Sequence, residues 1–287
     1  MVIIHDPRCA EYGSGQHPEQ PARVLSSAAY LLDAHPDWTW RLPPGDVPDS
    51  TLQLAHTAAH LRRLAEPRDF DGDTPYYTDI AGHARRAASA ALEAARHALD
   101  QGSPVFSLMR PPGHHATADQ AMGFCYLNQV AIAALAAQRD LAGARVAVWD
   151  FDAHHGNGTE AILRGRQNLL YCSVHQFPAY PGTGARDDAN CRNWPVAPGT
   201  PRARHREALS ASWDAIVGYR PSLVLVSAGF DAYAGDPITE MTLEAEDFAT
   251  LGTWVRDAGL PTAAVLEGGY SADLPKLIEA FLGAWAS

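Results

Sequence analysis

The chain has 287 residues, with 22 basic and 33 acidic side chains, so its formal net charge is −11 when histidine is neutral. This acidic balance leaves no basic face for phosphate groups, and we expect no nucleic-acid partner. It suits a cationic substrate that is attracted to an acidic mouth. The N-terminal residues lack the basic region of a signal peptide, and no apolar run approaches the roughly 20 residues that span a bilayer.

Cysteine usage indicates a reducing compartment. The four cysteines form no CxxC pair, and a disulfide framework is therefore not expected. Because targeting and membrane segments are also not recognised, we predict a cytoplasmic protein that makes no membrane contact.

The residues before position 80 show no clear periodicity, and we predict only mixed helix and loop there. Alanine-rich residues 84–99 predict a helix that ends at Gly102. The other predicted helices cover 123–139, 203–218 and 242–258, and one more starts at 158–163. Near-continuous apolar runs predict strands at 104–109, 144–152, 168–174, 221–229 and 261–269.

Strands that are apolar on both faces, and that alternate with helices, are typical of a parallel sheet covered by helices on both sides. We therefore predict a single α/β domain over residues 1–287. In such sheets, ligands bind beyond the carboxyl ends of the strands. The candidate site is therefore expected among the residues that follow the strands.

Four of the predicted strands run into polar side chains. In chain order, these are His114 and His115; then Asp150, Asp152, His154, His155 and Asn157; then Asp231 and Asp236; and finally Glu267 and Tyr270. A parallel sheet brings all four ends to one edge.

The DFDAHH segment predicts a metal site. Asp152 and His154 stand at i and i+2 of an extended segment and point the same way, and Asp231 after another strand supplies a third ligand. Two carboxylates and one imidazole without a thiolate suit a catalytic zinc with an open coordination position, or ferrous iron. A structural zinc more often has four ligands, usually including cysteine.

The RPPGHH segment presents two adjacent imidazoles on a backbone that two prolines stiffen. Close to a metal-bound water, whose pKa is lowered toward 7, a histidine can take the proton and later return it to a leaving amine. Asp150 and Asn157 are the nearby candidates to set the histidine tautomers. Tyr270 follows a glycine pair, whose flexibility would let the hydroxyl move over the metal and donate to a developing oxyanion.

These motifs, in this order and over nearly the whole chain, resemble the zinc-dependent histone deacetylase family, including its bacterial deacetylase-like and acetylpolyamine amidohydrolases. The matching segments are HPEQPAR (17–23), RPPGHH (110–115), GFCYLN (123–128), WDFDAHHGNGTE (149–160), SVHQFPAYPGTG (173–184), SAGFDAYAGDP (227–237) and LEGGY (266–270). Asn157 and the phrase SAGFDA are similar to the class II branch. The resemblance implies the arginase/deacetylase fold and an amidohydrolase that removes an acetyl or other short acyl group from lysine or a related aliphatic amine.

The resemblance also implies roles for individual residues. Zn²⁺ would be bound by Asp152, His154 and Asp231. His115 would be the general base and acid, with Asn157 behind it, and His114 would assist electrostatically, with Asp150 behind it. Tyr270 would polarise the acyl carbonyl. A structural potassium ion would be bound by the backbone carbonyls of Asp150, Asp152, His154 and Val174 and by the side chain of Ser173.

The substrate channel is implied in the same way. Phe124 and Tyr180, with Gly123 beside them, would form the walls of a narrow tunnel, and Arg23 would line an internal channel through which acetate leaves. Ile238 stands where eukaryotic polyamine deacetylases have a glutamate gatekeeper. Asp73, in the acidic loop 68–75, is our candidate rim residue for binding the substrate backbone or amine.

Three alternatives stay open. The protein can be an acetylpolyamine amidohydrolase that acts on small acetylated amines. An arginase-like enzyme with two manganese ions would need further carboxylate and histidine ligands. A non-catalytic binder of acyl-lysine is opposed by the intact His115 and Tyr270. The natural acyl group is not predicted, and a homo-oligomer is left open.

Overall fold

The computed structural model describes residues 1–287, and its centre is one eight-stranded sheet. The strand order is β2-β1-β3-β8-β7-β4-β5-β6, and every neighbouring pair is parallel. The strands are β1 (Val2–Ile4), β2 (Thr39–Arg41), β3 (Val105–Ser107), β4 (Val146–Asp150), β5 (Leu169–Gln176), β6 (Cys191–Val196), β7 (Leu223–Ala228) and β8 (Thr262–Leu266).

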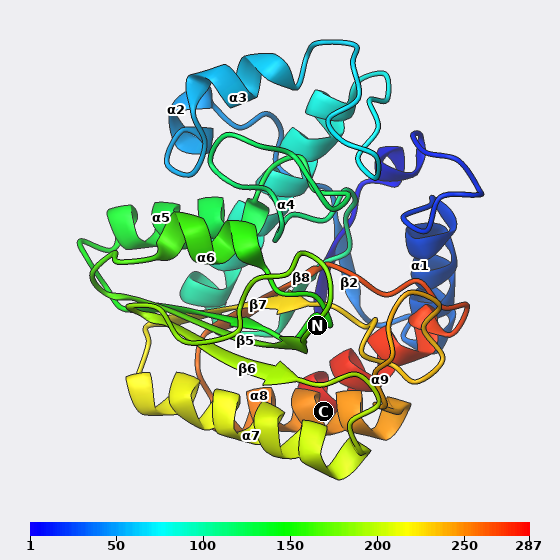
Figure 1. Ribbon diagram of the computed structural model, residues 1–287, viewed down its shortest axis with the longest axis vertical. Coiled ribbons are helices and arrows are strands. Elements are labelled where there is room, and N and C mark those ends of the chain that lie inside the picture. Colours follow the sequence, from blue (N-terminus) through cyan, green and yellow to red (C-terminus); the bar gives the residue numbers. More distant parts are fainter.

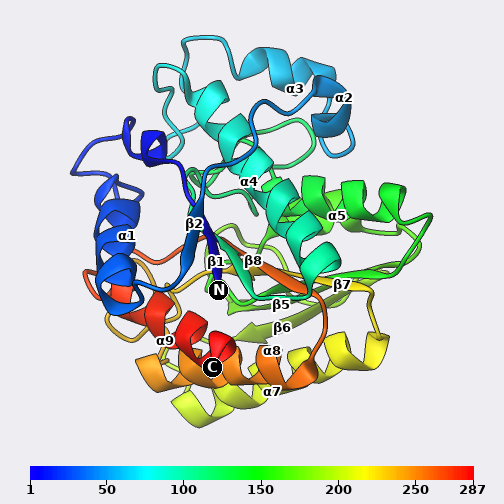
Figure 2. The same cartoon turned by 180° about the vertical axis from the view of Figure 1, so that it is seen from behind.

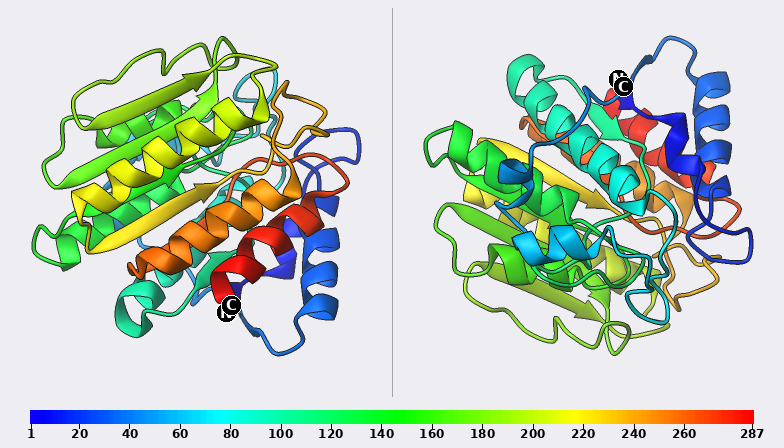
Figure 3. Two further views of the ribbon diagram at one scale, coloured as in Figure 1. Left: turned by 90° about the horizontal axis from the view of Figure 1, so that it is seen from below. Right: turned by 90° about the horizontal axis from the view of Figure 1, so that it is seen from above.

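Helices cover both faces of the sheet, as Figures 1, 2 and 3 show. On one face lie α4 (Ile80–Gln101), α5 (Gln129–Asp140) and α6 (Asn157–Leu163), with α2 (Asp49–Leu52) and α3 (Ala58–Arg63) outside them. On the other lie α7 (Arg202–Tyr219), α8 (Ala245–Ala258) and α9 (Leu274–Ala286). Helix α1 (Ala22–Ala34) packs against α9, and a short 3₁₀ helix, η1 (Pro7–Ala10), precedes it.

The sequence of the central strands explains this layering. All residues of β3, β4, β7 and β8 are buried, as expected for parallel strands that helices cover on both faces. The predicted α/β fold with a parallel sheet is therefore confirmed. No helix combines the length and the apolar character that crossing a membrane would require.

The expectation for residues before position 80 was wrong in one respect, because two strands of the sheet lie there. β1 and β2 each have only three residues, which is too short for a periodic pattern to show in the sequence. Strand β6, with two exposed residues, and helix α9 were also not predicted.

The helix predicted over 123–139 begins six residues later than expected. Helix α5 begins at Gln129, and the side chain of Asn128 caps it by accepting a hydrogen bond from the backbone N–H of Ala131 at 2.9 Å. Before it, Gly123 and Phe124 have positive φ angles of 55° and 68°, which a helix does not allow. Residues 123–128 therefore form an ordered loop beside the strand ends.

The four strands that run into polar segments are direct neighbours in the order β3-β8-β7-β4. Because all of them are parallel, their carboxyl ends lie at one edge of the sheet, as predicted.

Candidate active site

Three predicted metal ligands converge at this edge. Single ligand atoms of Asp152, His154 and Asp231 all lie within 4.8 Å of one another. The Nδ1 atom of His154 is 2.8 Å from an Asp231 oxygen and 3.3 Å from an Asp152 oxygen. Both carboxylates are buried, and such a set of oxygen and nitrogen donors fits a divalent cation.

The backbone around these carboxylates leaves no room for side chains. A Cβ atom added at Gly268 would lie 2.4 Å from an Asp231 oxygen and 2.5 Å from an Asp152 oxygen, and one at Gly229 would lie 2.0 Å from Asp152. The N–H of Gly268 donates to Asp152 at 2.7 Å, and the N–H of Ala153 donates to Asp231 at 2.8 Å. These contacts fix the orientation of both carboxylates.

Burial and the close approach of these ligands shift the pKa values of Asp231 and His154. Burial and the neighbouring Asp152 carboxylate raise the pKa of Asp231. Burial opposes the charged form of His154, but the Asp231 and Asp152 carboxylates outweigh it and raise its pKa to about 10. The cluster therefore attracts a positive charge, which a bound metal ion would supply in place of the histidine proton.

His114 is a buried cation. Its Nδ1 atom lies 3.1 Å from Asp150 Oδ2, and that oxygen also accepts a hydrogen bond from the hydroxyl of Tyr171 at 2.9 Å. Although burial lowers the pKa of His114, the carboxylates of Asp152 and Asp150 raise it to about 10. The imidazole is therefore protonated at neutral pH.

His115 is in the opposite state. Burial, followed by the neighbouring His114 cation, lowers the pKa of His115 well below its usual range, so the ring is neutral. Its Nδ1 atom lies 2.8 Å from Asn157 Oδ1, which can only accept, so Nδ1 carries the hydrogen and Nε2 is left with a free lone pair. Adjacent imidazoles with pKa values displaced in opposite directions are typical of acid–base sites.

Tyr270 is fixed from two sides. Its backbone N–H donates to Asp236 Oδ2 at 2.7 Å, and the guanidinium of Arg23 lies 4.8 Å above its ring. The Nε atom of Arg23 also donates to the carbonyl of Gly269 at 2.7 Å. The structure adds a steric reason for the glycine pair, because a Cβ atom at Gly268 would collide with the metal-site carboxylates and Gly269 has a φ of 115°. The mobility expected of the pair stays a prediction.

A cavity of about 310 Å³ connects these groups with the surface. Its lining residues are Pro18, Asp73, His115, Gly123, Phe124, His154, Tyr180, Ile238 and Tyr270. The ring of Tyr180 lies edge-on to that of His115, with centroids 5.1 Å apart, and Phe124 is 5.8 Å from Tyr270. A Cβ atom at Gly123 would lie 2.5 Å from the His115 ring, so no larger residue fits at this position of the cavity wall.

Comparison with known proteins decides the family. Residues 17–284 match the histone deacetylase domain. The chain belongs to this family. A probable deacetylase of Methanothermobacter thermautotrophicus is 36% identical over 94% of this chain and 86% of its own length. Acetylpolyamine amidohydrolase 2 of Pseudomonas aeruginosa is 36% identical over 88% of this chain and 78% of its own.

Solved structures agree with this assignment. The crystal structure of the acetylpolyamine aminohydrolase from Burkholderia pseudomallei superposes with a TM-score of 0.89 at 28% identity, covering 100% of this chain and 99% of that one. The protein is therefore a deacetylase of the histone deacetylase family, a hydrolase that acts on amide bonds of acetylated amines. Members of this family are generally metal-dependent, and the triad of Asp152, His154 and Asp231 can bind such an ion.

The mouth of the deacetylase cavity is built from exposed side chains. Tyr180 and Ile238 are 40% and 37% exposed, and Asp73 is exposed as well. His17 was assigned no role from the sequence. Its Nε2 atom lies 3.2 Å from the backbone carbonyl of Asp73, and its ring packs on that of Phe124 with centroids 4.8 Å apart. Its place in the HPEQPAR segment was the one available signal.

The residues predicted to bind potassium come from two neighbouring strands. Asp150 ends β4 and is paired with Ser173 inside β5, Val174 follows Ser173, and Asp152 and His154 come directly after β4. The Ser173 hydroxyl is 2.8 Å from Nδ1 of His175.

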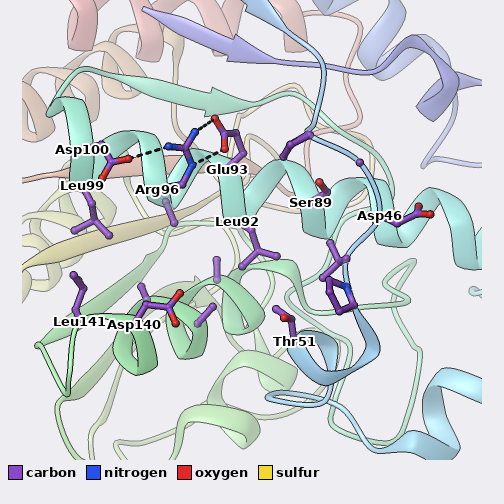
Figure 4. Close-up of a pocket in the computed structure, with 18 residues that line it drawn as sticks. Asp46, Thr51, Ser89, Leu92, Glu93, Arg96, Leu99, Asp100, Asp140 and Leu141 are labelled. Atoms are coloured by element: carbon purple, nitrogen blue, oxygen red, sulfur yellow. Dashed lines mark hydrogen bonds and ion pairs between the residues drawn. The ribbon is translucent and has the colours of Figure 1, made fainter.

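A larger cavity, of about 590 Å³, lies between α4, α5 and residues 44–51 and does not contain the chemistry (Figure 4). Ala133 and Ala136 are among its lining residues. Arg96, which also lines it, is already paired with Glu93 at 2.6 Å and with Asp100 at 2.9 Å. No metal-ligand cluster lines it, so volume alone would have indicated the wrong site.

Proposed function

We propose that the deacetylase uses zinc and removes an acetyl or other short acyl group from an aliphatic amine, either the ε-amine of lysine or a related amine. The observation that supports this most strongly is the placement of the histidine pair beside the metal triad. The two rings have centroids 4.1 Å apart, His114 Nε2 lies 3.8 Å from an Asp152 oxygen, and His115 lines one cavity with His154 and Tyr270.

The metal ligands in this proposal are Asp152, His154 and Asp231. When bound, Zn²⁺ would lower the pKa of a water molecule and polarise the acyl carbonyl. Fe²⁺ would fit the same donors. A structural K⁺ would be bound by the carbonyls of Asp150, Asp152, His154 and Val174 and the hydroxyl of Ser173.

The side chains divide the proton transfers between them. His115 Nε2 takes the proton of the attacking water, because Asn157 keeps the other ring hydrogen on Nδ1. The same nitrogen later gives the proton to the leaving amine. His114 remains positive against Asp150 and favours the negative charge that develops beside it. The Tyr270 hydroxyl, whose pKa burial raises well above its usual range, stays protonated and donates to the acyl oxygen.

The substrate stem would lie between Phe124 and Tyr180, with Gly123 giving room beside His115. Arg23, buried behind Tyr270, would line the route by which acetate leaves. At the mouth, the exposed Asp73 would bind a substrate backbone N–H or a second amine, and Ile238 would offer an apolar contact.

A small acetylated polyamine is the second candidate substrate. Asp73 lines the cavity at its mouth, and Asp71, two residues before it in the same acidic loop, adds a second carboxylate to that loop. Relatives named acetylpolyamine amidohydrolase favour the same substrate class.

The test is acetate release by zinc-loaded protein that is offered an acetyl-lysine peptide and acetylputrescine side by side. Turnover of at least one of them, abolished by chelation and strongly reduced in Tyr270→Phe, is the expected result. Turnover of the peptide alone would assign a protein substrate, and turnover of acetylputrescine alone a polyamine. Turnover that Tyr270→Phe leaves unchanged would contradict the mechanism.

A further inference from the structure

Glu267 is a buried carboxylate that the proposed chemistry does not use. It directly follows β8, is 0% exposed, and takes part in no ion pair within the chain. An ionised group in such a place is costly unless hydrogen bonds satisfy it.

The contacts of Glu267 go to the segment that presents the histidine pair. Its Oε2 atom accepts the backbone N–H of Gly113 at 2.6 Å and that of His114 at 3.1 Å. Its Oε1 atom accepts a longer hydrogen bond, of 3.4 Å, from the hydroxyl of Ser227 in β7. Two successive backbone N–H groups that converge on one oxygen define the local direction of the chain closely.

The opposite side of this segment packs against the start of α5. Gln129 Nε2 donates to the carbonyl of Pro111 at 3.2 Å. A Cβ atom at Gly113 would lie 2.3 Å from Gln129 Oε1 and 2.8 Å from the carbonyl of Leu127, so only glycine fits there. The rings of His114 and His115 are bound by Asp150 and Asn157. Each imidazole is therefore fixed at its ring by one partner, and their shared backbone is fixed by Glu267.

Glu267 also contacts the other wall of the site. Its backbone carbonyl accepts a hydrogen bond from Nη2 of Arg23, the residue whose guanidinium lies over Tyr270. One residue therefore connects the backbone of the proton-transferring histidine with the support of the oxyanion donor.

We propose that Glu267 is a positioning residue for the histidine pair and that it acts as a hydrogen-bond acceptor, not as a charge. This inference rests on the proposed function in one respect, because it assigns the proton transfers to His115. It goes beyond that function in naming what sets the backbone geometry of the base.

Two substitutions separate the acceptor from the charge. Glu267→Gln retains a carbonyl oxygen for both N–H groups, and its amide can donate to the Ser227 hydroxyl, which is able to accept. Glu267→Ala removes the acceptor and leaves both N–H groups unsatisfied. Burial raises the pKa of Glu267 to about 7, so the neutral amide is a close mimic of a state that the native residue itself adopts near neutrality.

The expected kinetic result is a loss of about 10²-fold in kcat for Glu267→Ala with little change in KM, since a shift of the base by about 1 Å costs this much. Glu267→Gln should retain kcat within a few-fold of the native enzyme, as should its zinc content. Loss of kcat in both variants would show that the charge matters, and retention in both would remove the positioning role.

Asp247→Ala is the matched control. Asp247 is also a buried carboxylate that accepts a backbone N–H, that of Glu244 at 2.8 Å, but it lies at the start of α8 away from the cavity. This variant should unfold at a lower temperature without a change in kcat. An equal fall of kcat in Asp247→Ala and Glu267→Ala would mean that general destabilisation explains both.

A second readout does not depend on turnover. Amide hydrogen exchange of residues 110–116 should become faster in Glu267→Ala and stay at the native rate in Glu267→Gln. Unchanged protection in Glu267→Ala would overturn the inference even if the enzyme is active. If the native protein hydrolyses no acylated amine, the proposed function fails, while the exchange result still decides whether Glu267 fixes this segment.

Discussion

The floor and the mouth of the cavity differ in how their side chains are restrained. At the floor, Asp152, Asp231 and Glu267 are each at most 1% exposed, and each accepts at least one backbone N–H. At the mouth, Tyr180 and Ile238 are 40% and 37% exposed, and Asp73 is exposed as well.

This difference has a physical meaning. Groups that act on the reacting atoms must be placed before the substrate arrives, because reorganisation during the reaction costs rate. Side chains at the mouth contact only the part of the substrate that carries the amine, away from the reacting atoms, and can adjust when it binds. The structure therefore specifies the reaction at the floor more closely than the substrate at the mouth.

The largest effect is expected at the metal triad. Asp231→Ala should lose most of its bound zinc and at least about 10³-fold in turnover, since the metal supplies several kcal/mol of transition-state stabilisation. Metal content and acetate release measure the two effects. Asp247→Ala should keep its zinc, and stoichiometric zinc in Asp231→Ala would refute the ligand assignment.

Tyr270→Phe should cause the second largest loss of turnover. Removing a single oxyanion donor costs about 2.7–4 kcal/mol of barrier, or on the order of 10²–10³-fold in kcat. The fold should persist, because the backbone N–H of residue 270 still donates to Asp236 and the ring still packs under Arg23. A KM that rises while kcat is kept would assign Tyr270 to binding.

The histidine pair predicts the pH profile. Because burial and His114 lower the pKa of His115, this ring stays neutral and able to accept a proton at pH values well below the usual 6.5. The acid limb of kcat/KM should therefore lie below pH 6.5. Asn157→Asp places a carboxylate at Nδ1, favours the protonated ring, and should move that limb to higher pH. If the acid limb of kcat/KM lies at the same pH in Asn157→Asp as in the native enzyme, His115 is not the base.

The smallest effect is expected at the mouth. Asp73→Asn should raise KM for a cationic amine by about five-fold, because an exposed charge pair contributes up to about 1 kcal/mol, and added salt should reduce the difference. Asp187→Asn, an exposed carboxylate beside Arg192, is the control. A large fall in kcat on Asp73→Asn would mean that the mouth takes part in the chemistry.

The same contrast explains what the sequence could predict. The metal ligands follow the buried strands β4 and β7, and the histidine pair follows the apolar run 104–109 that contains β3. Asp150 and Asn157 are close in sequence to those ligands, so the proximity of these groups followed from the parallel sheet. Strands β1 and β2, with three residues each, carry no periodic signal. The contact of Glu267 with Gly113 joins residues 154 positions apart, and only the folded chain shows it.

Local backbone geometry was also beyond the sequence. Residues 123–128 run directly into the apolar, alanine-rich pattern of α5 and were predicted to form its first turns, but tertiary packing places Gly123 and Phe124 at positive φ angles, where they border the cavity. The glycine pair before Tyr270 has a steric role that the sequence could not show. The nearby carboxylates of Asp152 and Asp231 leave no room for a side chain at residue 268.

The most direct test of a mononuclear, metal-dependent deacetylase is a zinc titration of metal-free protein with acetate release as the readout. Activity should rise in proportion to added zinc and level off at one equivalent per chain, as one triad of ligands predicts. No acetate release from either acetyl-lysine peptide or acetylputrescine at any zinc concentration would contradict the account, and a plateau only at two equivalents would indicate a dinuclear enzyme instead.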